Sequence, residues 1–81
     1  MRLIITNPNQ VGQIIRARRK ARRVSQQQLA AKLDLSQNRL SEIESGVAPL
    51  SLERLITLAN VLGLQLVLQD KIDEPESAGE W

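Results

Sequence analysis

A pair of short helical patterns, separated by a three-residue connection, is the feature that most constrains the fold of this chain. Ser25 precedes the first pattern, and a glutamine follows it after three residues, which is the spacing of a capping box. Ser36 is placed to cap the second pattern, and Gly46 lies just after it, at the position where a glycine commonly ends a helix. The sequence therefore predicts helices over about residues 26–33 and 37–44, joined by a tight turn.

The two predicted helices differ in what their faces carry. Leu29 and Leu33 in the first helix, and Leu40 and Ile43 in the second, have the spacing of an apolar, inward face. The other side of the second helix carries amides, a hydroxyl and a carboxylate, at Gln37, Asn38, Ser41 and Glu42. Such groups match the donors and acceptors on base edges in the major groove of DNA. The pattern favours a helix-turn-helix whose second helix reads DNA, and the alternative is a merely soluble helix surface.

Further helices are predicted on both sides of this pair. Asn7 and Pro8 are typical of a helix start, so we expect a helix over about residues 8–22. Ser51 and Gly63 are placed to begin and end a fourth helix between them. This fourth helix is the most apolar, with Leu52, Leu55, Ile56, Leu58, Ala59 and Leu62.

The two ends of the chain differ from this helical body. Residues 1–7 are expected to form an arm or a short strand, and residues 64–69 alternate partly with period two, which predicts a strand. Residues 70–81 are acidic and lack an apolar face, so we expect disorder there. An isolated strand has unpaired backbone groups and needs a partner, for which residues 2–6 of the same chain and the same strand of a second copy are the two candidates. We expect residues 64–69 to pair across a dimer axis, with the sheet widened by residues 3–6. The residues of this dimer strand are Leu64, Leu66, Val67 and Leu68. The expected fold class is mainly α, with a four-helix domain over residues 8–63.

The charges are divided between a basic body and an acidic tail. Six basic residues fall in the eight positions 16–23 without an interleaved acid, which favours an anionic partner such as DNA. For Arg16, Arg22 and Arg23, phosphate contact and simple solvation stand equally open. The chain has no Cys and no His, which excludes disulfides, the usual zinc sites and His-based catalysis. We expect no enzymatic activity, no metal and no cofactor. Without a signal peptide or membrane-spanning pattern, a cytoplasmic protein is expected.

The stretch IIRARRKARRVSQQQLAAKLDLSQNRLSEIESG, which ends at Gly46, resembles the helix-turn-helix of the phage-repressor-like family, also called the Xre or Cro/C1 type. The stretch SLERLITLANVLG extends this resemblance through the fourth helix. The resemblance implies that Gln37 and Asn38 enter the major groove first. The residues that would touch neighbouring bases are Ser36, Ser41 and Glu42.

Other roles are also implied by this resemblance. Gln26 matches a glutamine that contacts the DNA backbone, as Ser25 and Arg39 are expected to do, although capping of the helix end is an alternative for Gln26. Arg19 and Glu44 match a pair that forms an internal salt bridge, which assigns them to structure.

Three positions depart from the family pattern. Arg18 stands where Leu is usual, and Arg23 and Asp34 stand where Gly is usual. Aspartate tolerates the left-handed conformation of a turn. A left-handed arginine costs of order 1 kcal/mol, so Arg23 is the less expected of the two. The alternatives for Arg23 are that it lengthens the connection between the helices or contacts a phosphate.

The whole chain also resembles the HipB-like family of antitoxins, through a fourth helix followed by a strand, a short acidic tail and a terminal Trp81. This resemblance implies a homodimer that binds an inverted-repeat operator in double-stranded DNA and holds a HipA-like kinase toxin. Trp81 is the candidate toxin-binding residue, because Trp is over-represented at binding hot spots, and a chance ending is its alternative. Two other functions stand open: a stand-alone repressor of phage or restriction-control type, and a protein-interaction module with a vestigial DNA face.

Overall fold

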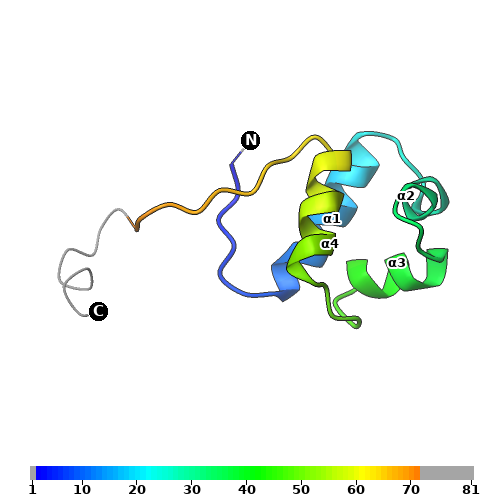
Figure 1. Cartoon of the computed structure of the whole chain (residues 1–81), viewed down its shortest axis with the longest axis horizontal. Coiled ribbons are helices and arrows are strands. Elements are labelled where there is room, and N and C mark those ends of the chain that lie inside the picture. Colours follow the sequence, from blue (N-terminus) through cyan, green and yellow to red (C-terminus); the bar gives the residue numbers. More distant parts are fainter. Residues whose placement is uncertain (1, 72–81) are drawn as a thin grey trace.

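The structure is a computed structural model that describes residues 2–71. Within these residues the chain forms four helices, drawn in Figure 1. Their bounds are α1 (Asn9–Ala21), α2 (Gln26–Lys32), α3 (Gln37–Glu44) and α4 (Leu52–Val61). The mainly α, four-helix architecture predicted from the sequence is confirmed, with α3 at the predicted bounds and the other helices within one residue of them. No helix among residues 2–71 is long and apolar enough to cross a membrane.

Serine side chains begin three of the helices. The Ser25 hydroxyl accepts a hydrogen bond from the Gln28 amide, and the Gln28 side chain accepts one from the Ser25 amide, so the predicted capping box forms. Ser36 and Ser51 cap α3 and α4 through the amides three residues further on. The start of α1 differs from the prediction, because Pro8 takes the cap position. Asn7 still contributes, since its Oδ1 accepts from the Asn9 amide at 2.9 Å.

All four helices end in the same backbone motif, a left-handed residue just after the last turn. These residues are Arg23, Asp34, Gly46 and Gly63, with φ of 57°, 57°, 82° and 73°. In each case the amide of the following residue bonds back to a carbonyl five residues earlier, as in a Schellman motif. The following residue is apolar every time, and at Val24, Leu35 and Leu64 it packs against the core. Repetition of this motif turns the chain sharply after each helix and keeps the domain small.

The core lies between the helices and is made of leucines and isoleucines. Leu29, Leu40, Leu58 and Leu62 are its fully buried large side chains, drawn from α2, α3 and the end of α4. Gly12 allows α1 to approach α3 closely, because a Cβ there would lie 2.5 Å from the Ile43 carbonyl oxygen. This contact fixes the end of α3 against α1.

Some apolar residues of the helices are exposed. Ala17 lies on the outer side of α1, and Leu52 and Ile56 lie on the outer side of α4, where they are 68% and 44% exposed. A single face of about 100° is buried on each helix, so the most apolar helix has more apolar residues than its buried face can hold.

The segments before α1 and after α4 have no regular secondary structure in the described part of the chain. The predicted strand at residues 64–69 is therefore not seen in the single chain. Arg2 donates a hydrogen bond to Gln69 Oε1, and Figure 1 shows the two segments lying beside each other. Leu66, Val67 and Leu68 are exposed along the second segment. Residues 72–81, with Trp81, lie outside the described residues.

Candidate nucleic-acid interface

The outer side of α3 is a polar face, formed by Gln37, Asn38, Ser41 and Glu42. All four side chains are exposed, whereas Leu40 and Ile43 on the opposite side are buried. Ser36, at the cap, is exposed as well. The sequence-predicted base-reading residues therefore lie together on one surface of one helix.

Arg39 stands on α3 beside this polar face and is also exposed. Its Nη1 lies 3.5 Å from Glu42 Oε1, and both side chains are about half exposed. An ion pair this long and this exposed contributes little to stability. Both side chains therefore remain free to exchange this contact for another partner.

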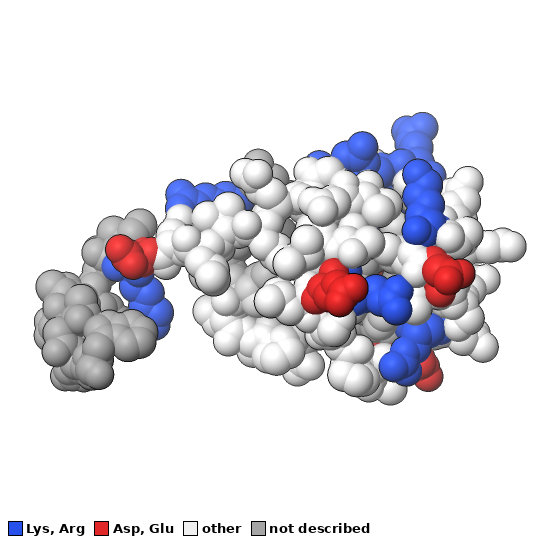
Figure 2. Space-filling view, viewed as in Figure 1, with Lys and Arg blue, Asp and Glu red and all other residues white. Residues whose placement is uncertain are grey.

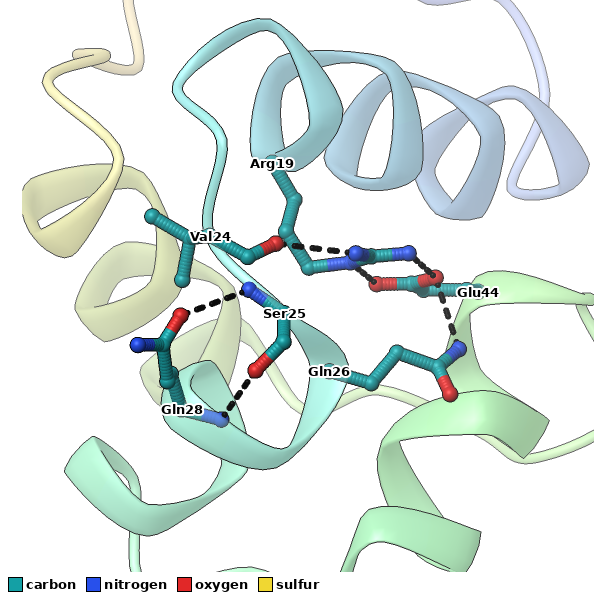
Figure 3. A network of polar contacts seen from close by, with 6 residues as sticks. All are labelled: Arg19, Val24, Ser25, Gln26, Gln28 and Glu44. Atoms are coloured by element: carbon teal, nitrogen blue, oxygen red, sulfur yellow. Dashed lines mark hydrogen bonds and ion pairs between the residues drawn. The ribbon is translucent and has the colours of Figure 1, made fainter.

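A polar network behind α3 holds the helix-turn-helix together (Figure 3). Arg19 of α1 forms a bidentate ion pair with Glu44 at the end of α3, with Nε to Oε2 at 2.7 Å and Nη2 to Oε1 at 3.0 Å. Arg19 Nη1 also donates to the Val24 carbonyl, which lies just before α2, at 2.9 Å. One guanidinium therefore connects the end of α1, the start of α2 and the end of α3.

This ion pair is buried and completely satisfied. Arg19 is 7% exposed and Glu44 is 5% exposed. Among the described residues, no buried side-chain nitrogen or oxygen lacks a hydrogen-bond partner. A buried pair contributes little net stability over an apolar alternative, but removal of one partner is strongly destabilising. The principal effect of the Arg19–Glu44 pair is to fix the relative positions of the three helices.

Gln26 lies at the first position of α2 and is half-buried. Its Nε2 donates to Glu44 Oε1 at 3.0 Å, as Figure 3 shows. Helix capping, the alternative role considered for Gln26, is performed instead by Gln28. The sequence does not reveal the contact between Gln26 and Glu44, because no local pattern pairs side chains 18 positions apart.

Two of the clustered arginines bond to the end of α4. Arg18 Nε and Arg22 Nη1 donate to the Leu62 carbonyl oxygen at 3.1 Å and 3.2 Å. Positive charge at a helix C-terminus is favourable, because the unpaired carbonyls there carry partial negative charge. Arg18, which departs from the family pattern, therefore has a structural partner. The spacing of four residues between the two arginines was a signal of a shared face.

The remaining basic residues are distributed unevenly over the surface. Arg16, Lys20 and Arg23 are exposed. In Figure 2 most basic side chains in view lie toward the end of the molecule formed by α2 and α3, with acidic groups among them. The surface over α4 and over residues 64–69 is mostly uncharged in the same view. Among residues 2–71, no group of three or more acidic side chains is placed to hold a metal ion.

Arg54 is a further structural arginine, and the sequence did not reveal its role. It comes from α4, is half-buried, and its Nη1 donates to the Leu33 carbonyl oxygen at 2.8 Å. This contact joins α4 to the last turn of α2, just before the connection to α3. The end of α2 is therefore held from the α4 side, as the end of α3 is held by Arg19.

The geometry combines an exposed amide and hydroxyl surface on a rigidly held helix with basic side chains around it. This combination is suited to reading base edges while cations contact phosphates. A family model described as "Helix-turn-helix" matches residues 15–69 of the chain. An uncharacterized HTH-type transcriptional regulator, y4dL, of Sinorhizobium fredii (strain NBRC 101917 / NGR234) is 38% identical over 61 residues. The match covers 75% of this chain and 31% of that regulator, so the chain spans about a third of its length.

Two solved structures share the fold. The restriction-modification controller protein C.AhdI from Aeromonas hydrophila is 30% identical, with a TM-score of 0.65, over 70% of this chain and 86% of the controller. A protein chain in the structure of a HipA-HipB-O2-O3 complex has a TM-score of 0.75, over 88% of this chain and 100% of that chain. Its sequence identity is 22%, so this second likeness shows the fold alone.

Proposed function

The chain belongs to the Xre/Cro-type helix-turn-helix family, and we propose that it is a sequence-specific autorepressor and the antitoxin of a HipA-like kinase toxin. The family fold is that of DNA-binding transcriptional regulators, which act by binding rather than by catalysis. The observation that carries the DNA-binding part is the polar face of α3, because its four exposed side chains stand opposite a completely buried side.

The polar face of α3 selects the sequence. Gln37 or Asn38 forms a bidentate pair with adenine N6 and N7, and Glu42 accepts from cytosine N4. Ser36 and Ser41 contact the neighbouring bases. In the free protein, Arg39 restrains Glu42 only weakly, so Glu42 can turn toward a base when DNA arrives.

Contacts to the DNA backbone supply affinity that does not depend on sequence. Ser25, Gln26 and Arg39 make them on the helix-turn-helix, and the exposed Arg16 and Arg23 add phosphate contacts from the end of α1. Arg22 also remains a candidate, because its bond to the Leu62 carbonyl uses one N–H of five.

The functional unit is a homodimer. Residues 64–69 pair with the same segment of a second copy across the two-fold axis, and residues 3–6 widen the sheet. Two observations support this proposal: Leu66, Val67 and Leu68 are exposed, and Arg2 brings the two segments together. A two-fold dimer would set its recognition helices about one DNA turn apart, roughly 34 Å, and read an inverted repeat.

The antitoxin part is supported by the likeness to a chain of the HipA–HipB complex, which extends over the whole of that chain. The surface for the toxin lies outside the DNA face, and Trp81 is its candidate contact residue. The second candidate function is a stand-alone repressor. It is favoured by the 30% identity to a restriction-modification controller, which is higher than the identity to the HipA–HipB complex chain.

Co-purification with the neighbouring gene of the operon tests the antitoxin proposal. The chain would be expressed with that gene, once intact and once ended after Asp70. We expect a kinase-sized partner to co-purify with the intact chain, and the shortened chain measures what the tail and Trp81 contribute. A protein that purifies alone as a dimer from both would contradict the antitoxin proposal and leave the stand-alone repressor.

Selection from a random-sequence duplex library tests the DNA-binding part separately. We expect enrichment of an inverted repeat, because the dimer is two-fold symmetric. Enrichment of no sequence at all would contradict sequence-specific DNA binding, whatever the result with the toxin.

A further inference from the structure

We propose that Glu44 is a positioning residue for DNA binding, because it holds the Gln26 amide in the orientation that presents an N–H to a phosphate. The inference rests on the proposed DNA-binding function and deepens it. The family resemblance assigns the Arg19–Glu44 pair to structure alone. In this proposal the pair also raises the affinity for DNA.

The chemistry of the carboxylate fixes the orientation of the amide. An ionised Glu44 side chain can only accept hydrogen bonds, so it must face the NH₂ group of Gln26 and not its carbonyl. Glu44 Oε1 receives two donors, Arg19 Nη2 at 3.0 Å and Gln26 Nε2 at 3.0 Å. One N–H of the amide is used in this way, and the second remains for a phosphate oxygen.

Arg19 makes a carboxylate tolerable in this position. A bare negative charge beside the DNA backbone would repel phosphates, but the bidentate guanidinium neutralises Glu44. Arg19 also bonds to the Val24 carbonyl, which lies two residues before Gln26. The same group therefore places the start of α2 and the carboxylate that orients its first side chain.

The neighbouring glutamine provides an internal control. Gln27 follows Gln26 on α2 and is exposed, whereas Gln26 is half-buried against Glu44. Both residues carry the same chemical group at the same end of the same helix. Only Gln26 is oriented by a charged partner, so only Gln26 should depend on Glu44.

A double-mutant cycle on DNA affinity tests this dependence. The probes are the selected duplex and a duplex of scrambled sequence, and each variant is first shown to be folded by circular dichroism. We expect Gln26→Ala to weaken binding to both duplexes by about tenfold, because a hydrogen bond to a charged phosphate is lost. Gln27→Ala should change binding by less than about twofold, which is the size of effect expected from a residue that is not coupled to the site.

The decisive variant is Glu44→Gln, alone and combined with Gln26→Ala. A glutamine at position 44 can donate as well as accept, so the Gln26 amide loses its fixed orientation. We expect Glu44→Gln alone to weaken binding by roughly five- to tenfold, and to change affinity by less than about twofold in the Gln26→Ala background. Equal losses in both backgrounds would show that Glu44 acts only through stability, and would overturn the inference.

Side-chain amide relaxation in the wild-type protein keeps the inference testable if Glu44→Gln does not fold. We expect the Gln26 NH₂ group to show an order parameter near that of rigid backbone, about 0.85, and Gln27 to fall below about 0.6. A Gln26 amide as mobile as that of Gln27 would contradict the proposal. Loss of sequence selection itself would instead contradict the proposed function, so the two failures are distinguishable.

Discussion

Arg23 and Asp34 hold the same left-handed backbone angle, φ of 57°, at equivalent positions after α1 and α2. In the same positions α3 and α4 have Gly46 and Gly63. A glycine takes this conformation without steric cost, aspartate takes it at a small cost, and a long side chain takes it at about 1–2 kcal/mol. The domain therefore stores strain after α1 that a glycine would remove.

Replacing Arg23 with glycine should stabilise the protein. We expect Arg23→Gly to raise the free energy of unfolding by about 0.5–1 kcal/mol, because relief of the left-handed strain exceeds the added chain entropy of glycine. Asp34→Gly is the matched control and should gain less. Urea unfolding followed by circular dichroism measures both, and a loss of stability in Arg23→Gly would contradict this reading of the turn.

The same arginine should contribute to DNA binding through charge. We expect Arg16→Gln and Arg23→Gln each to reduce the slope of log K against log salt concentration by about 0.9, since each removes one phosphate contact. The matched control is Lys32→Gln, an exposed cation to which no contact is assigned. Fluorescence anisotropy with a scrambled duplex, repeated at several salt concentrations, gives the slopes. Unchanged slopes would assign both arginines to simple solvation.

Base selection should depend on the polar face of α3. We expect Gln37→Ala or Asn38→Ala to cost about 1–3 kcal/mol of binding to the selected duplex, with a much smaller effect on a scrambled one. Gln13→Ala, an exposed glutamine on α1, is the matched control. If the double change at Gln37 and Asn38 lowered affinity for both duplexes equally, α3 would not be the reading helix.

The sequence predicts well those features that depend on residues close together in the chain, and it predicts poorly those that depend on contacts across the fold. Ser25, Ser36, Ser51 and Gly46 act on groups within a few residues, so the sequence predicted their helix ends almost to the residue. Apart from the Arg19–Glu44 pair, which the family resemblance implied, the sequence did not reveal the side chains that bond across the fold. The contacts of Arg22 with Leu62 and of Gln26 with Glu44 depend on how the helices pack, and no local pattern encodes that packing.

Residues 64–69 show a second reason why a prediction from sequence can fail. Their alternation predicts a strand, but a strand forms only against a partner, and the single chain supplies none in the described residues. The apolar composition of α4 has a related limit, because a count of apolar residues does not say that Leu52 and Ile56 face outward.

The close approach of α1 and α3 should be intolerant of even one methyl group. At Gly12 a Cβ would lie 2.5 Å from the Ile43 carbonyl oxygen and 2.7 Å from that of Glu44, and both are main-chain atoms that cannot rotate away. We expect Gly12→Ala to lower the free energy of unfolding by about 1–3 kcal/mol, despite the better helix propensity of alanine. Gln13→Ala on the exposed side of the same helix should change it little. Thermal unfolding of the two variants compares them directly, and equal stability would mean that α1 and α3 are more loosely packed than the structure shows.

Dimer formation should depend on the apolar segment after α4. Val67 and Leu68 are exposed in the single chain, so lysines there should leave the helical domain folded while placing like charges together across the two-fold axis. We expect Val67→Lys with Leu68→Lys to shift the protein from dimer to monomer in sedimentation equilibrium at micromolar concentration. Val47→Lys is the matched control, because Val47 is a similarly exposed valine in the loop after α3. A dimer that survives the double change would move the interface elsewhere, and the exposed Leu52 and Ile56 on α4 would be the next surface to test. A wild-type protein that sediments as a monomer would contradict two-fold pairing altogether.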